Sequence, residues 1–339
     1  EGILEEIEVR AGRAGTKPGA DAPSFRIALA LPKSASAQHP APLILGANFC
    51  GNRTTFAAPA LSKPRAGGCS GEGFQPAVIR LLLGMYTMTG PTAEIVRRGY
   101  AYATFYPPEI AADDKAAAPA DLARIAMALG PDHKDRAPLG VIAAWAAGFS
   151  WALDVMEADA RIDHAREAVY GHSRDGKAAL VAAAWDSRID TVIAHQPGKG
   201  GGTLTRAYAG ESVKQITTSY PHWFAPAYAA YADHETDAPV DQHELLALIA
   251  PRPMLLGNGW NDVWSDPNGA FRAALGATPV YQLHGAKGLT QTGLGDEHAH
   301  GDIDWWIRPG AHGVRKADWA AFLTFLDAKF GRPADHASR

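Results

Sequence analysis

The chain has 339 residues, of which 47% are hydrophobic and 20% charged, and its formal net charge is -4. This length supports one large α/β domain with an ample core, and the slight negative balance gives no electrostatic footprint for nucleic acid or an anionic membrane. No apolar run approaches the length that spans a bilayer, so we expect no nucleic acid and no membrane among the partners. The chain starts EGILEEIEVR, in which no signal peptide is visible, and the compartment cannot be deduced from this segment.

Two cysteines are present, Cys50 and Cys69. Two reduced thiols in the core are one interpretation. A single disulfide that closes the loop between them is the other, and it would imply an oxidising compartment. The spacing between them is not that of a C-x-x-C metal motif.

Apolar runs alternate with helical patterns along the chain. We expect residues 1–24 to lie on the surface, and residues 53–90 and 203–240 to form long irregular loops. The predicted strands are 25–31, 42–47, 100–106, 168–170, 190–194, 253–257 and 279–283, and the main predicted helices are 92–98, 122–129, 141–157, 178–185, 241–249 and 316–330. This order predicts one α/β domain over 1–339, with a mostly parallel central sheet covered by helices on both faces.

The most informative stretch is GHSRDGK, residues 171–177. It follows a short apolar run and precedes a small-residue helix, which is the strand-turn-helix context of the nucleophile in α/β-hydrolases. Ser173 is therefore the candidate nucleophile, in an α/β-hydrolase fold with a three-layer αβα sandwich. The second glycine comes one residue late, at Gly176, with Asp175 in its place, so an ordinary strand-to-helix turn is the alternative interpretation.

A serine nucleophile needs a base and an orienting carboxylate, which follow it in the order acid, then histidine, in this fold. His312 lies in a glycine-flanked loop just before the last helix and is the candidate base. Asp262 lies in the loop after the 253–257 strand and is the favoured acid. Asp266 is its competitor, although Asp266-Pro267 is more typical of a helix N-cap.

With these residues the chain resembles the glucuronoyl esterases, carbohydrate esterase family 15, and especially their bacterial branch. The similarity covers most of the chain, and its motifs are NFCGN (48–52), RGYA (98–101), AAW (143–145), GHSRDGK (171–177), PHWF (221–224), DQHELLALIAPRP (241–253), DVWSDP (262–267) and RPGAH (308–312). The resemblance implies a secreted or periplasmic serine esterase that hydrolyses the ester between (4-O-methyl-)glucuronic acid of glucuronoxylan and lignin alcohols. It would use a Ser-His-Asp triad and an acyl-enzyme.

The resemblance also suggests roles around the nucleophile. Arg174 would stabilise the oxyanion, Lys177 would donate to sugar hydroxyls, and Trp264 matches a sugar-contacting tryptophan. Trp223 belongs to the aromatic 203–240 stretch, which with the 53–90 loop would form the rim that meets a polymeric substrate.

One departure from the family pattern affects the choice of acid. Many members carry a catalytic glutamate in the loop after the strand that follows the nucleophile helix. The corresponding residues here, 195–198, are HQPG and contain no carboxylate. The resemblance therefore leaves Asp262 as the acid.

Neither a cofactor nor a metal is expected. There is no H-E-x-x-H pattern, and the DEHAH cluster at 296–300 stands alone. We expect a monomer acting on a glucuronoxylan or lignin-carbohydrate substrate. The alternatives are another carbohydrate esterase, acting on acetyl or methyl esters, and a catalytically silent glycan-binding module.

Overall fold

The computed structural model describes residues 2–12, 15–19, 22–65, 67–69, 84–129, 138–206, 209–296 and 301–331. The strands are β1 (Gly2–Arg10), β2 (Ser24–Pro32), β3 (Ala41–Ala47), β4 (Ala101–Phe105), β5 (Ile162–His172), β6 (Thr191–His195), β7 (Met254–Gly259) and β8 (Ile303–Arg308). The α-helices are α1 (Asn52–Thr55), α3 (Thr92–Arg97), α4 (Ala118–Leu129), α5 (Val141–Met156), α6 (Arg174–Trp185), α7 (Val213–Ser219), α8 (Pro226–Ala229), α9 (Gln242–Ala247), α10 (Pro267–Leu283) and α11 (Lys316–Lys329). Short 3₁₀ turns are η1 (Met85–Thr87), η2 (Pro107–Glu109) and η4 (Glu235–Asp237).

The described strands form one sheet in the order β1-β2-β4-β3-β5-β6-β7-β8. The pairs from β4 through β3 to β8 are parallel, whereas β1 and β2 are antiparallel additions at one edge. Every residue of β3, β4, β6 and β7 is buried, as expected for strands covered on both faces. The predicted α/β-hydrolase fold with a mostly parallel sheet is confirmed.

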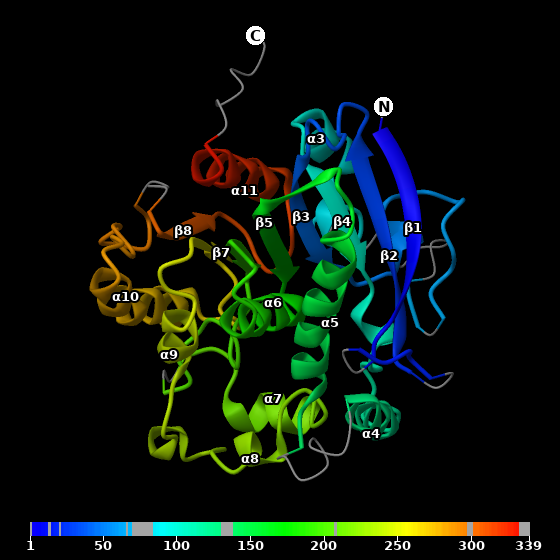
Figure 1. Ribbon diagram of the computed structural model, residues 1–339. Helices are drawn as coiled ribbons and strands as arrows, with labels where there is room; N and C mark the ends of the chain where they lie inside the picture. Colours follow the sequence, from blue (N-terminus) through cyan, green and yellow to red (C-terminus); the bar gives the residue numbers. More distant parts are fainter. Residues whose placement is uncertain are drawn as a thin grey trace.

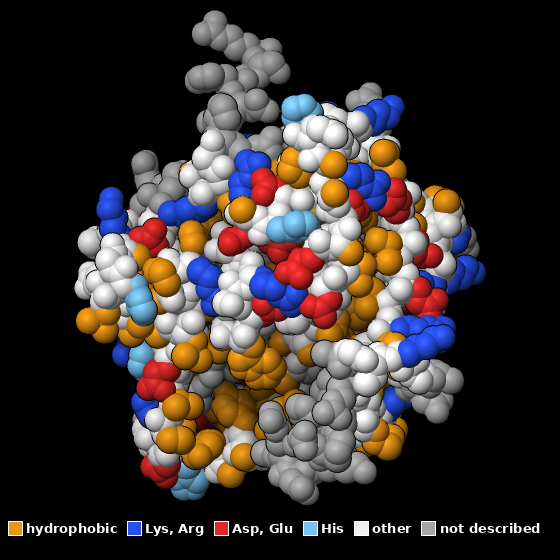
Figure 2. All heavy atoms as spheres, viewed as in Figure 1, with side chains coloured by type: hydrophobic (Ala, Val, Ile, Leu, Met, Phe, Trp, Pro, Cys, Tyr) orange, Lys and Arg blue, Asp and Glu red, His pale blue; other side chains and the backbone are white. Residues whose placement is uncertain are grey.

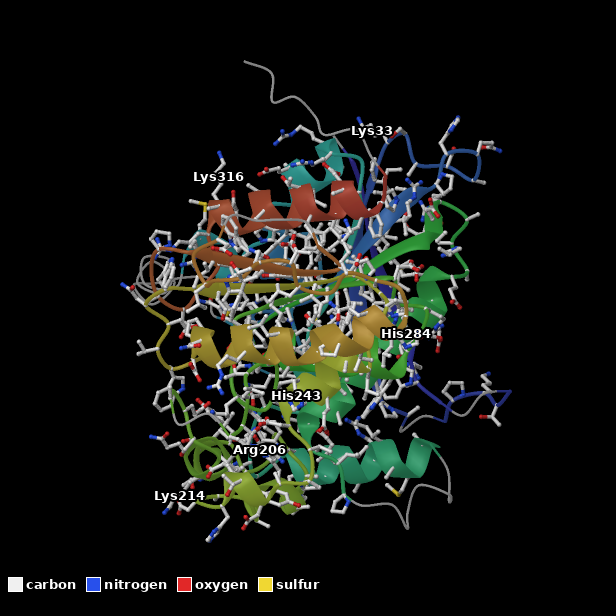
Figure 3. All side chains as sticks on the ribbon, turned by 90° about the vertical axis from the view of Figure 1, so that its left-hand side faces the viewer. Lys33, Arg206, Lys214, His243, His284 and Lys316 are labelled. Carbon is white, nitrogen blue, oxygen red and sulfur yellow. A yellow bond between two sulfur atoms is a disulfide. The ribbon has the colours of Figure 1, made fainter. Side chains whose placement is uncertain are left out.

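Two hydrophobic clusters cover the two faces of the sheet. One contains buried side chains of α5, α6 and α10, among them Trp145, Leu180 and Tyr281. The other contains Ile95 of α3 and the aromatic face of α11, centred on Phe322. Figure 1 shows α3 and α11 above the sheet and α5, α6, α9 and α10 below it. In Figure 3, α10 and α11 run on opposite sides of the strands.

Four expectations about individual elements were wrong or incomplete. The 203–240 stretch, expected to be irregular, contains the short helices α7 and α8 and the turn η4. Residues 279–283 are not a strand but the last part of α10, in which Pro279 is internal. Because Pro279 has no backbone N–H, the Leu275 carbonyl lacks its usual hydrogen bond within the helix. Residues 2–10 are largely exposed, as expected, yet they form β1 by pairing with β2. Residues 303–308, to which no element was assigned, form the edge strand β8.

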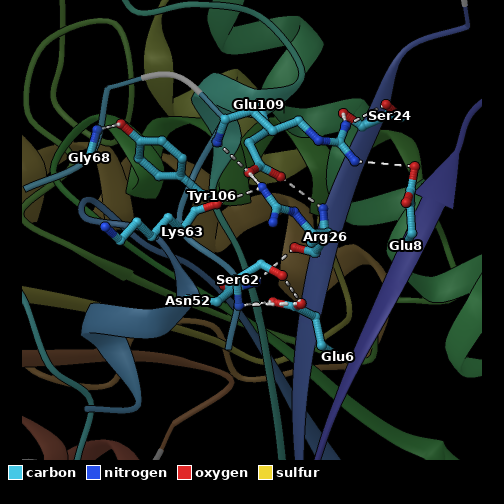
Figure 4. A network of polar contacts seen from close by, with 12 residues as sticks. Glu6, Glu8, Ser24, Arg26, Asn52, Ser62, Lys63, Gly68, Tyr106 and Glu109 are labelled. Carbon is cyan, nitrogen blue, oxygen red and sulfur yellow. Dashed lines mark hydrogen bonds and ion pairs between the residues drawn. The ribbon is translucent and has the colours of Figure 1, made fainter. Parts of the chain in front are cut away.

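The described part of the 53–90 loop is tied to the sheet. Cys50 and Cys69 form a disulfide. Polar contacts also join this loop to β2 and η2 (Figure 4), and among them Glu109 of η2 accepts from the Arg26 and Arg65 backbone N–H groups at 3.0 and 3.1 Å. Residues 70–83 of this loop, which was expected to contribute to the rim, lie outside the described residues.

Figure 2 shows acidic and basic side chains interspersed over one face of the molecule. Among the described helices, none combines the length and the apolar composition needed to cross a bilayer.

Candidate active site

The predicted elbow is the junction of β5 and α6. Ser173 is the N-cap of α6 and has φ 55° and ψ -125°, a conformation that non-glycine residues rarely adopt. A Cβ at Gly171 would lie 2.1 Å from the Asp175 carbonyl oxygen, and one at Gly176 would lie 3.0 Å from the Gly171 oxygen. The two glycines therefore let strand and helix meet closely, although they do not match the usual pentapeptide spacing.

The predicted acid and base are in contact. His312 Nδ1 lies 2.7 Å from Asp262 Oδ2, and Ser265 Oγ lies 3.4 Å from the same nitrogen. Burial opposes ionisation of Asp262, but hydrogen bonds from His312 and Ser265 and the charge of His312 outweigh it, and the pKa of Asp262 is lowered. Asp266 instead accepts the Gly269 N–H at 2.9 Å and caps α10. Of the two candidates, the carboxylate facing His312 is therefore Asp262.

The loop that carries His312 is held through its backbone. Gln196, directly after β6, accepts from the Gly313 N–H at 2.8 Å and donates to the Ala311 carbonyl at 3.4 Å. Arg308, at the end of β8, donates to the carbonyls of Ala311 and Gly313 at 3.2 and 2.5 Å. The peptides on both sides of His312 are thus fixed by buried side chains.

A buried polar cluster lies behind this loop. Asp318 of α11 accepts from Arg308 Nε at 2.8 Å and lies 3.4 Å from His195 Nε2. His195 and His172 approach at 3.1 Å between their Nδ1 atoms, and the His172 ring lies 4.7 Å from that of His312. Burial, and then the charges of His312 and His195, keep the pKa of His172 well below its usual range, so a neutral ring lies beside His312.

Ser173, His312 and Asp262 line one cavity of about 310 Å³. Its remaining lining residues are Lys177, Gln196, Pro197, Gly198, Glu211, Tyr220, Trp223, Trp264 and Ser265.

Lys177 and Glu211 add two ionisable side chains to this cavity, besides Asp262 and His312. Lys177 Nζ donates to the carbonyls of Pro197 and Lys199 at 2.5 and 2.6 Å, so part of its hydrogen-bonding capacity is used within the protein. Burial lowers the pKa of Lys177 to about 8, against the opposing effect of Glu211 and Asp262. Burial likewise raises the pKa of Glu211, although Lys177 and a hydrogen bond from Trp264 oppose the shift.

The two predicted tryptophans differ in exposure. Trp264 is 53% exposed at the cavity mouth, whereas Trp223 is buried in the wall with Tyr220 stacked on it at 3.9 Å between ring centroids. Arg174 is not among the described residues that line the cavity. Its guanidinium lies 4.9 Å from the centroid of the Phe49 ring and pairs with Asp113 at 3.0 Å.

Sequence reasoning missed four residues of this region, namely Asp113, Gln196, Glu211 and Ser265. Gln196 lies in the HQPG segment, which was discussed only because it contains no carboxylate. Ser265 lies within the DVWSDP motif and Glu211 within the 203–240 stretch, but neither residue was singled out. Asp113 comes from a loop to which no function was assigned. Within the described residues, no group of three or more His, Cys, Asp or Glu side chains is arranged to hold a metal ion. Residues 297–300 of the DEHAH cluster lie outside the described residues.

Comparison with known proteins gives a consistent result. A family model described as "Glucuronyl esterase, fungi" matches residues 51–285. This chain belongs to the glucuronyl esterase family. Carbohydrate esterase MZ0003, from an unknown prokaryotic organism, is 35% identical over 312 residues, which cover 91% of this chain and 72% of that protein.

Two solved structures are also similar. A glucuronoyl esterase from Solibacter usitatus has a TM-score of 0.80 and 31% identity, covering 98% of this chain and 87% of that one. A promiscuous CE15 esterase from a marine bacterial metagenome has a TM-score of 0.77 and 31% identity, covering 96% and 85%. The predicted resemblance to bacterial glucuronoyl esterases, and the class of carboxylic ester hydrolase, are confirmed.

The similarity to fungal glucuronoyl esterases is more restricted. The 4-O-methyl-glucuronoyl methylesterase 1 of Wolfiporia cocos is 34% identical over 176 residues, which cover 48% of this chain and 42% of that protein. The chain therefore aligns with less than half of the length of that fungal relative.

Proposed function

We propose that this protein is a serine esterase that hydrolyses esters of glucuronic acid, with Ser173 as nucleophile, His312 as base and Asp262 as orienting acid. The single observation that carries the proposal is the 2.7 Å contact between His312 Nδ1 and Asp262 Oδ2 at the cavity lined by the strained Ser173. The metagenomic and Solibacter structures are of esterases.

The chemistry follows from the positions of the protons. A carboxylate only accepts hydrogen bonds, so Asp262 favours the His312 tautomer with the proton on Nδ1 and leaves Nε2 as the base. Ser173 Oγ attacks the ester carbonyl as its proton passes to Nε2. The protonated His312 then gives that proton to the leaving alcohol, and water releases the acyl group from Ser173 by the same steps in reverse.

We assign three further residues to substrate. Lys177 and Trp264 would contact the sugar, Lys177 through the hydrogen-bonding capacity left beyond its two backbone acceptors. Arg174 would stabilise the oxyanion, since a guanidinium presents a positive charge and several N–H donors. Trp223 would act as a wall of the cavity, because only 6% of its surface is exposed.

The proposed natural substrate is the ester between glucuronic acid of glucuronoxylan and a lignin alcohol. The Cys50–Cys69 disulfide supports a secreted or periplasmic location for this chemistry, since disulfides persist in oxidising compartments.

A broader ester range is the second candidate, and the promiscuity stated for the metagenomic relative favours it. Measuring kcat/KM on benzyl glucuronate and on acetylated xylan, the latter by acetate release, separates a glucuronoyl esterase from a broader esterase. Equal values of kcat/KM on both substrates would favour the broader esterase.

The decisive variant is Ser173→Ala, assayed on benzyl glucuronate. We expect a loss of kcat on the order of 10⁶-fold, as for removal of a serine nucleophile from other triads. A folded variant that retains turnover would reject the mechanism. Measurable xylan binding, together with failure of the wild-type Ser173 to react with an organophosphonate, would favour a glycan-binding module.

A further inference from the structure

One carboxylate outside the cavity collects contacts from three side chains around the candidate site. Asp113 Oδ2 lies 3.0 Å from Arg174 Nη1. Its Oδ1 accepts from Trp223 Nε1 at 2.7 Å and from His222 Nε2 at 2.9 Å. Both carboxylate oxygens are therefore in contact with neighbouring side chains: Oδ2 with Arg174, which follows the candidate nucleophile, and Oδ1 with Trp223 in the cavity wall.

The backbone on the N-terminal side of Asp113 is held by hydrogen bonds. Trp145 Nε1, in the buried core, donates to the Ala111 carbonyl at 2.8 Å. The Ala112 N–H donates to Asp121 of α4 at 2.9 Å. Glu109, four residues earlier, belongs to the polar network shown in Figure 4. The carboxylate is thus presented by a rigid turn.

Arg174 is held from a second side by an aromatic face. The Phe49 ring lies under the guanidinium at 4.9 Å, and the next residue, Cys50, is bonded to Cys69. An arginine loses considerable rotamer freedom when it is confined, and a stacked ring alone does not fix the direction of its N–H groups. The ion pair with Asp113 supplies that direction, because a charged hydrogen bond is both strong and geometrically specific.

We propose that Asp113 is a positioning residue, which orients the Arg174 guanidinium and the Trp223 indole relative to Ser173. This inference rests on the proposed function, since it takes Arg174 as the group that stabilises the oxyanion. Asp113 acts through Arg174 and Trp223 and takes no proton in the reaction. An arginine that is 30% exposed would otherwise sample solvent-facing rotamers, in which it contributes little to the transition state.

The test is a double-mutant cycle on benzyl glucuronate with the full chain. We expect Asp113→Ala to lower kcat about tenfold and Arg174→Ala about a hundredfold, with the double variant no worse than Arg174→Ala alone. Asp113→Asn keeps an acceptor for Trp223 but loses the charge, and we expect it to recover part of the activity. Asp114→Asn, an exposed neighbour on the same turn, is the matched control and should equal the wild type.

Two results would overturn the inference: wild-type kcat in Asp113→Ala, or losses from Asp113→Ala and Arg174→Ala that multiply in the double variant. If Asp113→Ala does not fold, the same cycle with the near-isosteric Asp113→Asn decides the question. Activity in Ser173→Ala would contradict the proposed function instead, so the two failures are distinguishable.

Discussion

The ends of β6 and β7 are neighbours in the sheet and serve the same loop in different ways. Gln196, after β6, bonds the backbone on both sides of His312, whereas Asp262, after β7, bonds the His312 ring. Both side chains are buried, but only the second is charged. The comparison shows two kinds of support for one loop: the neutral amide bonds its backbone, and the carboxylate bonds its imidazole. In the proposed mechanism, the carboxylate would favour the tautomer with the proton on Nδ1.

The largest effect is expected at the end of β7. Asp262→Asn removes the charge that stabilises protonated His312 and favours the wrong tautomer, so kcat should fall on the order of 10⁴-fold. Steady-state kinetics on benzyl glucuronate measure this. Asp266→Asn is the matched control, because asparagine caps helices as well as aspartate does, and it should stay close to wild type. The reverse pattern would assign the acid to Asp266.

The largest effect on stability is expected from the buried polar cluster behind the His312 loop, which contains Asp318, Arg308 and His195. Asp318→Asn leaves Arg308 buried without its counter-charge and should lower the free energy of unfolding by about 3 to 5 kcal/mol. Burial raises the pKa of Asp318, but His195 and Arg308 outweigh this effect and hold the pKa well below its ordinary value. Its contribution is therefore complete at neutral pH and falls as the pH drops below about 4.

Urea denaturation of wild type and Asp318→Asn at pH 7 and pH 3 measures both effects. Asp327→Asn is the control, since Asp327 lies on the same helix and also pairs with a partly buried arginine, Arg98, at 2.7 Å. Like Asp318→Asn, it should lower the free energy of unfolding, because it removes the charge that faces Arg98. Equal pH dependence in wild type and Asp318→Asn would contradict the role of Asp318.

A smaller loss is expected at the end of β6 itself. Gln196→Ala removes two hydrogen bonds to the His312 loop, each worth about 1 kcal/mol, and should lower kcat about tenfold or somewhat more. Gln196→Glu in an Asp262→Asn background sharpens the comparison, because it places a carboxylate at this strand end. The side chain here faces backbone rather than the His312 ring, so no recovery is expected. Recovery of activity would show that the two strand ends are interchangeable.

The smallest effect concerns pH and Lys177, whose ammonium is held by the loop after β6. Because burial lowers the pKa of Lys177 to about 8, raising the pH through this value neutralises the group, and the hydrogen bonds proposed between Lys177 and the sugar would weaken. The KM for benzyl glucuronate should rise by about threefold to tenfold between pH 7 and pH 9. In Lys177→Met the KM should be higher throughout and should not change over this range. A wild-type pH profile in that variant would assign the effect to another group.

The sequence alone determined the local parts of this protein. The elbow around Ser173 was predictable because its glycines, turn and small-residue helix lie within a few positions of one another. Strands β3, β4, β6 and β7 were predictable because burial on both faces makes them largely apolar, and Asp262 and His312 were located by chain order and family resemblance. The parallel edge strand β8 was not predicted, because its sequence, IDWWIR, contains charged residues. Strand β1 and the end of α10 were not predicted, because pairing with β2 and packing of Tyr281 against the core decided them against weak or contrary local signals.

Only the tertiary structure decided which distant side chains complete the site. Asp113 meets Arg174, and Gln196 meets the loop around His312, across separations that leave no periodic pattern in the sequence. The sequence favoured Asp262 over Asp266 but left both open, and the fold brings Asp262 against an imidazole fifty residues later in the chain. Hydrogen bonds of this kind depend on the relative placement of whole strands and loops, which the packing of the sheet between its two helical layers determines.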